Sequence, residues 1–181
     1  MRRVGLALIG AGFIADYHLE GLAAVEEAQV RLIAGRTRAR AEALAHRFSI
    51  REVADDADAV LARDDIDAVV IATPDDTHEE IAVRAAGVGK AILLQKPMAT
   101  TSAACRRIIA AAERAGVSVA VSYMHRHFAG VEAARELLAA GAIGTVTSLR
   151  IRNATPGPDW AGWFFEPDRV SGGAVFQLGI H

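Results

Sequence analysis

Two glycines near the start of the chain have the type and spacing needed to hold a phosphate group. In "VGLALIGAGFIADYH", Gly10 and Gly12 stand between an apolar run and a helical pattern. Gly10 permits a tight turn there, and Gly12 lets the backbone approach a pyrophosphate, which the N–H groups and dipole of the next helix would hold. Phe13 and Ile14 begin that helix and are candidate contacts of the same ligand. The pattern predicts a dinucleotide site, although methyltransferases and plain tight turns also contain such glycines.

The stretch "LIAGRTRAR" ends the second expected strand and bears on the choice of dinucleotide. An NAD site usually has an acidic residue there for the ribose hydroxyls, but this stretch supplies Gly35, Arg36 and Thr37 instead. An arginine and a hydroxyl suit a 2′-phosphate, which a carboxylate would repel. The alternative is a solvated basic helix start, although cations are unfavourable at a helix N-terminus. We therefore expect NADP as the cofactor, with NAD as the second candidate.

Polar residues in three further stretches are candidates for chemistry. Lys96 comes after an apolar core strand, where a lysine that merely extends along the surface would be poorly placed. Gln177 and His181 are four residues apart and would share one face of a helix. His125 and His127 are two apart, but they have no acid or cysteine cluster nearby. We expect structural or pocket-lining roles for this histidine pair and no metal site.

The elements that must position these residues alternate between strand and helix over residues 1–122. Unbroken apolar runs are typical of parallel strands that are covered on both faces. The expected strands are Val4–Ile9, Val30–Ala34, Ala68–Ala72, Ala91–Leu94 and Val117–Ser122. Expected helices include Ile14–Glu27 and Thr101–Ala115, the second of which stops at Gly116. This order predicts an α/β fold, a doubly wound parallel sheet of the Rossmann type.

Residues 123–181 have a different character and predict the start of an incomplete α+β second domain. A helix is expected at Val131–Ala140, before Gly141. The segment Val146–Arg152 alternates apolar and polar residues, as a strand with one wet face would. The irregular stretch that follows is rich in proline, glycine and aromatic residues, which resembles a substrate or lid loop. Its aromatic residues Trp160, Trp163, Phe164 and Phe165 would line a sugar site or form the second core.

Composition narrows the class of protein. The 181 residues are 52% hydrophobic and 23% charged, and the net charge of −2 gives no basic footprint for nucleic acid or an anionic membrane. Cys105 is the single cysteine, which fits a reducing cytoplasm. The basic and apolar start resembles a signal peptide in outline but lacks a convincing cleavage site, and no run is long enough to span a membrane.

An ordered set of motifs resembles the Gfo/Idh/MocA oxidoreductases, which include glucose–fructose oxidoreductase and inositol dehydrogenase. The motifs are "GAGFIA", "ATPDDTH", "LLQKP", "GAIGTV" and "SGGAVFQLGIH". The resemblance implies that Thr73 and Pro74 lie beside the nicotinamide ribose, and that Lys96 hydrogen-bonds the reacting hydroxyl. It also implies that His181 exchanges a proton with the substrate oxygen, a task that suits histidine near neutral pH. His78 would contact the cofactor or simply pack at a helix start.

The chain departs from the resemblance at three places. The motif Glu-Lys-Pro reads Gln95-Lys96-Pro97 here, and the usual aspartate four residues before the histidine is Gln177. A glutamine orients a substrate or water by hydrogen bonds but carries no proton. In relatives the histidine lies mid-chain and a large open sheet follows, so we expect a truncated chain. A full-length form would be a homo-oligomer.

Two main hypotheses for function follow, and a weaker third. The first is an NADP-dependent oxidoreductase that transfers a hydride between nicotinamide and a sugar, polyol or related hydroxy or carbonyl compound. The truncated chain itself would bind cofactor better than it turns over substrate. The second is a non-catalytic dinucleotide-binding sensor or regulator, which Gln95 and Gln177 favour. The third, a methyltransferase, is disfavoured by Lys96-Pro97 and Arg36.

Overall fold

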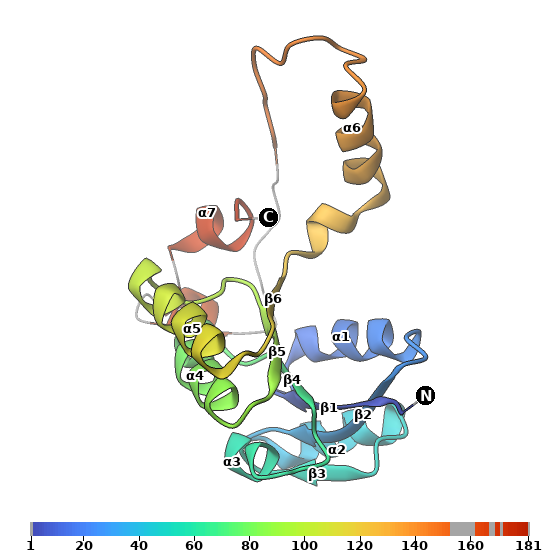
Figure 1. The fold of residues 1–181 in the computed structure, drawn as a ribbon, viewed down its shortest axis with the longest axis vertical. Coiled ribbons are helices and arrows are strands. Elements are labelled where there is room, and N and C mark those ends of the chain that lie inside the picture. Colours follow the sequence, from blue (N-terminus) through green and yellow to red (C-terminus); the bar gives the residue numbers. More distant parts are fainter. Residues whose placement is uncertain (1, 153–161, 167–168, 171, 181) are drawn as a thin grey trace.

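A six-stranded parallel sheet forms the centre of the protein (Figure 1). The computed structural model describes residues 2–152, 162–166, 169–170 and 172–180. The strand order is β3-β2-β1-β4-β5-β6, which confirms the predicted doubly wound fold. The strands are β1 (Val4–Ile9), β2 (Ala28–Ala34), β3 (Glu52–Ala54), β4 (Ala68–Ile71), β5 (Ala91–Gln95) and β6 (Val119–Ser122).

Helices connect the strands and continue beyond the sheet. Those within the sheet region are α1 (Phe13–Ala23), α2 (Arg38–Arg47), α3 (Ala57–Leu61), α4 (His78–Gly87) and α5 (Ser102–Ala115), with the short 3₁₀ helix η1 (Asp75–Thr77) before α4. Beyond β6 lie η2 (Met124–His127), α6 (Ala129–Ala139), η3 (Gly162–Phe165) and α7 (Gly173–Gln177). The predicted stop of α5 is confirmed, because Gly116 has a left-handed φ of 67°. None of the helices in the described residues is long and apolar enough to cross a membrane.

Apolar side chains cover both faces of the sheet, which explains why its strands are unbroken apolar runs. On one face Leu8 and Ile33 pack with Leu19 of α1 and with α2. On the other face Ile71 and Leu94 pack with α3, α4 and α5, which supplies the fully buried Ile108. Figure 1 shows α4 and α5 together on one side of the sheet and α1 on the other. The sheet is therefore the middle layer of three.

The register of the strands brings their carboxyl ends to one edge. Ile9 at the end of β1 pairs with Ala34 of β2 and with Ile71 of β4, and Ile71 pairs in turn with Leu94 of β5. The strand order reverses between β1 and β4, and ligands of open parallel sheets bind at such a reversal, outside the carboxyl ends of the strands. The fold thus gathers the segments that follow β1, β2, β4 and β5 at one place.

Several expected elements differ from the observed ones. The first helix begins at Phe13 and ends at Ala23, four residues before its expected end, and the short elements β3 and α3 were not expected. The predicted strand Val146–Arg152 is wrong: these residues pair with no other described segment, and Leu149 and Ile151 are each 77% exposed. An alternating pattern forms a strand only where a neighbour accepts its hydrogen bonds. The predicted domain division between residues 122 and 123 stays a prediction.

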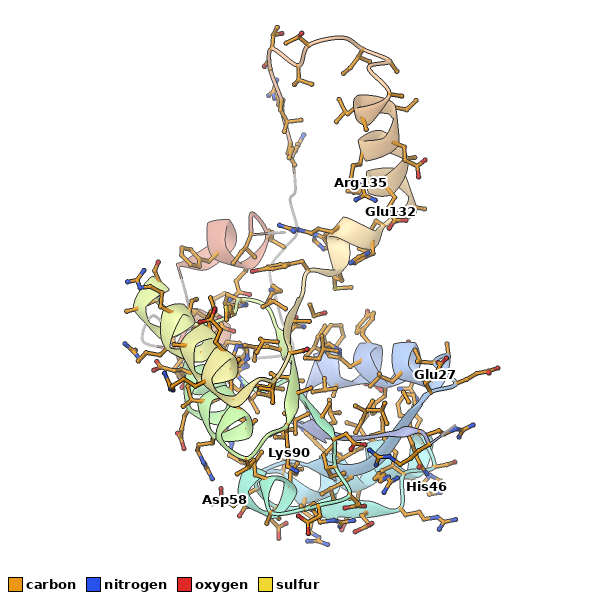
Figure 2. All side chains as sticks on the ribbon, viewed as in Figure 1. Glu27, His46, Asp58, Lys90, Glu132 and Arg135 are labelled. Atoms are coloured by element: carbon orange, nitrogen blue, oxygen red, sulfur yellow. The ribbon has the colours of Figure 1, made fainter. Side chains whose placement is uncertain are left out.

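The segment after β6 reaches away from the sheet. Figure 1 shows α6 and the chain that follows it extending well beyond the layer of α1. None of the residues of α6 is buried, and Figure 2 shows Glu132 and Arg135 on this helix. The expected helix of this region is confirmed with slightly shifted ends, and Gly141 after it has a φ of 70°. Among the described residues that follow α6, those of α7 lie back beside the sheet, where Gln177 contacts Lys96.

Candidate functional site

The glycine loop after β1 is held tightly against its neighbouring strands. Gly10 has a φ of 111°, and its N–H donates to the carbonyl oxygen of Ala34 at 2.8 Å. A Cβ on Gly10 would lie 2.5 Å from the carbonyl oxygen of Ala72. Gly35 has a related role after β2, since a Cβ there would lie 3.0 Å from the Cβ of Ala11. Gly10 is therefore required by the close approach of backbone at Ala72 and by its positive φ, and Gly35 allows the loop residue Ala11 to pack closely beside it.

Gly12 faces open space and begins helix α1. Nothing lies within 4 Å of the position that its Cβ would take, and no side chain caps the helix. The first N–H groups of α1 therefore point toward a cavity of about 650 Å³ without a protein acceptor from a capping side chain. Phe13 and Ile14 line the same cavity, and Phe13 stacks edge-on against Tyr17 at a centroid distance of 5.3 Å. This cradle fits the pyrophosphate of a dinucleotide.

Cationic and hydroxyl groups line the cavity beyond the end of β2. Arg36, Thr37 and Arg40 all lie in its wall and are exposed. Within the described part of the chain, neither Arg36 nor Arg40 forms an ion pair, whereas Arg38 pairs with Asp55 at 3.1 Å and with Glu42. Two guanidinium groups are thus available to a ligand at this end of the cavity.

Two acidic residues also line this end of the cavity, and both are engaged elsewhere. Asp55 accepts a hydrogen bond from Arg38, and Asp56 caps helix α3 by accepting from the N–H of Ala59 at 2.9 Å. Neither carboxylate pairs with Arg36 or Arg40 in the described residues. An anionic group bound beside Arg36 and Arg40 would therefore meet two guanidinium groups that no protein carboxylate occupies.

The segment after β4 supplies hydroxyls and a buried ring. Thr73 and Pro74 line the cavity, and the Thr77 hydroxyl lies 2.7 Å from both the Thr73 hydroxyl and the Pro74 carbonyl oxygen. His78 is fully buried and does not line the cavity. Its Nδ1 and Nε2 each lie 2.9 Å from a carbonyl oxygen, of Pro97 and Thr73 respectively. His78 therefore ties the ends of β4 and β5 together from behind the cavity wall.

Lys96 lines the same cavity directly after β5. Gln95 is buried and its side-chain oxygen accepts from the N–H of Lys96 at 2.7 Å, and the Lys96–Pro97 peptide bond is cis. The Lys96 ammonium donates to the side-chain oxygen of Gln177 at 2.7 Å and to its carbonyl oxygen at 3.1 Å. Burial lowers the pKa of Lys96, and the negative charge of Asp75 opposes that shift.

Helix α7 brings Gln177 to Lys96 across a long sequence separation. The helix ends at Gln177 and residues 178–180 form a turn, so the helix expected to carry both Gln177 and His181 is shorter than predicted. His181 lies outside the described residues, and its expected role in proton exchange stays a prediction. Trp163 of η3 also lines the cavity, whereas Phe165 is 71% exposed. Trp160 lies outside the described residues as well.

Sequence reasoning missed several polar residues that line this cavity, among them Asp75, Arg40 and Asp55. Asp75 stands inside the motif "ATPDDTH", so the motif contained the signal but its carboxylate was not recognised as part of the site. Arg40 lies in the first turn of α2, and Arg36 precedes the helix cap Thr37, so no helical spacing relates the two residues. No spacing in the sequence points to Asp55, because it reaches the cavity through the unexpected strand β3.

The fold and the glycine cradle define a dinucleotide-binding Rossmann domain, and comparison with known proteins places it in a family. Residues 4–123 match the oxidoreductase family with an NAD-binding Rossmann fold (GFO_IDH_MocA), and residues 131–181 match the GFO/IDH/MocA C-terminal domain. The chain belongs to the Gfo/Idh/MocA oxidoreductase family. The resemblance stated from the motifs is thereby confirmed.

Curated and solved relatives agree with this assignment. The chain is 30% identical to 1,5-anhydro-D-fructose reductase of Ensifer adhaerens over 183 residues, all of this chain and 54% of that one. A crystal structure of GenD2 from gentamicin A biosynthesis in complex with NAD superimposes on this chain with a TM-score of 0.94 at 35% identity. The match covers all of this chain and 52% of the GenD2 chain. KijD10, a 3-ketoreductase from Actinomadura kijaniata in complex with NADP and TDP-benzene, gives a TM-score of 0.72 at 30% identity over 77% of this chain and 43% of that one.

The relatives are longer than this chain, and their solved structures contain different dinucleotides. The chain spans about half the length of most of the curated relatives it matches, for example 39% of D-apiose dehydrogenase of Paraburkholderia graminis and 54% of the reductase above. One solved relative holds NAD and another NADP. Family membership therefore supports an NAD(P) cofactor and leaves the choice between the two to the residues of this chain.

Proposed function

We propose that this protein is the cofactor-binding part of an NADP-dependent oxidoreductase that acts on a sugar, a polyol or a related hydroxy or carbonyl compound. We choose NADP because Arg36 and Arg40, which line the cavity with Thr37, form no ion pair within the described residues. A guanidinium group binds a phosphate strongly and with defined geometry. The acids at this end of the cavity are occupied by Arg38 and by the α3 cap.

The cavity has two ends that suit the two ends of a dinucleotide. The Arg36 end would hold a 2′-phosphate, and the cradle at Gly12 would hold the pyrophosphate. Thr73 and Lys96 lie at the other end, where the nicotinamide would deliver or accept a hydride when bound. There Lys96 would donate a hydrogen bond to the reacting oxygen of the substrate, and Trp163 would cover part of the substrate. His181 would exchange the proton.

Substrate class follows from the family and not from the geometry of the described residues. The relatives include enzymes named for a sugar, an anhydrosugar and inositol. These compounds share a secondary alcohol or ketone, which is the group that Lys96 and a neighbouring acid–base residue can serve. A complete second domain would close the substrate side of the cavity, and such a full-length form would be a homo-oligomer.

Titration of NADPH and NADH, by fluorescence or calorimetry, tests this proposal. We expect NADPH to bind more tightly, and Arg36→Ala to weaken NADPH binding by about 10- to 100-fold while NADH changes little, because a hydrogen bond to a charged group contributes about 1.5–3 kcal/mol. Arg106→Ala is the matched control, since it removes one positive charge from an exposed position on α5 away from the cavity. Equal binding of the two dinucleotides, or equal losses in the two variants, would refute NADP selectivity.

A dinucleotide-binding sensor or regulator is the second candidate. Glutamines at positions 95 and 177, where the resemblance implies carboxylates, favour it. A longer form of the chain with a complete second domain would distinguish the two candidates. Reduction of NADP⁺ in the presence of a panel of polyols and sugars would eliminate the sensor, and its absence together with tight NADPH binding would favour it.

A further inference from the structure

A buried carboxylate lies next to the Lys96 site and belongs to neither of the positions where the resemblance implies one. Asp75 is the first residue of η1, four positions after the last residue of β4, and only 4% of its surface is exposed. It lines the same cavity as Lys96. One of its carboxylate oxygens accepts a hydrogen bond from the side-chain nitrogen of Gln177 at 2.7 Å, and this contact is buried.

Gln177 thus connects a carboxylate to an ammonium. Its nitrogen donates to Asp75, and its side-chain oxygen accepts from Lys96, with 2.7 Å in each contact. A carboxylate only accepts hydrogen bonds and an ammonium only donates them. The amide of Gln177 therefore has one orientation that satisfies both neighbours. Asp75 selects that orientation, and the orientation places an acceptor where the Lys96 ammonium lies.

Residues 75 and 177 are chemically matched. An acidic residue at 177 would put two carboxylates within hydrogen-bonding distance, where like charges repel in a poorly hydrated site. An apolar residue at 177 would leave both Asp75 and Lys96 without this contact. A glutamine at 177 therefore suits a site whose negative charge stands at 75.

We propose that Asp75 is a positioning residue that holds Lys96 in place through Gln177, and that it supplies the negative charge which Gln95 and Gln177 do not. The consequence for hydride transfer rests on the proposed function, because it requires that Lys96 contact the substrate oxygen. The connection from Asp75 through Gln177 to Lys96 does not depend on whether Lys96 contacts a substrate. Removal of the Asp75 charge should therefore change the environment of Lys96 even with no ligand bound.

The charges around Lys96 in the described part of the chain agree with this assignment. Its ammonium faces Asp75 of η1 and Gln177 of α7, and the neighbouring Gln95 and Thr73 are uncharged. Arg36, Arg40, Asp55 and Asp56 line the part of the cavity near β2 and β3 instead. Burial lowers the pKa of Lys96 and Asp75 raises it, so loss of the Asp75 charge would lower this pKa further.

The chain allows this to be measured directly, because Lys90 and Lys96 are its only lysines. Lys90 is buried elsewhere, with its ammonium donating to the carbonyl oxygens of Arg63 at 2.6 Å and Ile66 at 2.9 Å. Figure 2 shows Lys90 at the part of the domain away from α7. Trace labelling with acetic anhydride as a function of pH, read by mass spectrometry, follows the titration of each lysine separately, and Lys90 is the internal control.

Three variants make the test specific. Asp75→Asn removes the charge, and Asp76→Asn removes the same charge from the exposed neighbouring residue, which faces Arg169 instead. Asp75→Asn combined with Gln177→Glu exchanges the acid and the amide, so the negative charge again lies beside Lys96. Circular dichroism and thermal unfolding confirm that each variant is folded before labelling.

We expect Asp75→Asn to shift the titration of Lys96 to lower pH and to raise its labelling rate near pH 8 by about threefold or more, as loss of a nearby unit charge would. Asp76→Asn should leave the titration of Lys96 unchanged, and the exchanged pair should restore it. Equal behaviour of Asp75→Asn and Asp76→Asn, or no restoration in the exchanged pair, would overturn the proposal. The assay contains no dinucleotide, so failure of NADPH binding would refute the proposed function without altering this result.

Discussion

Substitution of Gly10 by alanine should destabilise the fold through two separate effects. The new Cβ would lie 2.5, 2.6 and 2.9 Å from backbone atoms of Ala72 and Thr73, closer than side-chain carbons approach in real structures. The φ of 111° at this position is also unfavourable for alanine, which adds about 1–3 kcal/mol. Relief of the clash requires β1 and the segment after β4 to move apart, and overpacking of this kind costs about 1–3 kcal/mol. We expect a total loss of about 2–6 kcal/mol in the free energy of unfolding, a large part of a typical domain's stability.

Urea unfolding followed by circular dichroism measures this loss, with Gly12→Ala as the control. A Cβ at position 12 meets no atom within 4 Å, so we expect Gly12→Ala to remain within about 1 kcal/mol of the wild type. The same variant should weaken dinucleotide binding, because its methyl group would enter the cavity at the pyrophosphate cradle. If Gly10→Ala proved as stable as Gly12→Ala, the close packing of the glycine loop against the end of β4 would be refuted.

Two further substitutions test local features of the fold. Thr101→Ala should lower the free energy of unfolding by about 1 kcal/mol, because the Thr101 hydroxyl caps α5 by accepting from the N–H of Ala104 at 3.1 Å. Thr101→Ser keeps a hydroxyl and should retain most of the wild-type stability. Equal losses for the two variants in urea unfolding would exclude a cap. Burial lowers the pKa of His18, so the unfolded chain takes up a proton more readily and stability should fall as pH drops below about 6.5. Unfolding at pH 7.5 and 5.5 should show a smaller decrease for His18→Gln than for the wild type, and identical pH dependence would contradict the burial of His18.

The sheet could be predicted from the sequence because its strands are apolar runs separated by helical patterns. β1, β4 and β5 are buried on both faces, and this leaves an unmistakable pattern. β3 has three residues and α3 has five, so neither is long enough to show a period. The error at Val146–Arg152 has the opposite cause. Alternation was present, but a strand depends on a neighbour that a local pattern does not reveal.

The part of the candidate site that could be predicted consists of residues at the carboxyl ends of strands. The glycine cradle, Arg36, Thr73 and Lys96 each begin within two residues of the end of a strand, and the parallel register brings them together. The contact between Asp75 and Gln177 joins residues 102 positions apart, and no spacing rule connects them. Only the return of the chain to the sheet edge at α7 creates that pair.

The parallel sheet has a consequence for how the site forms during folding. The two halves of the sheet, β3-β2-β1 and β4-β5-β6, meet at the pairing of β1 with β4, where Gly5 contacts Asp67 across 62 positions of sequence. Chain entropy opposes such non-local pairing until both halves are present, which makes it slow relative to the formation of helices. The cavity lies on this seam, with Gly10 on one side and Thr73 on the other. A partly folded chain in which only one half has formed therefore has no binding site, and dinucleotide binding selects the state in which both halves have joined.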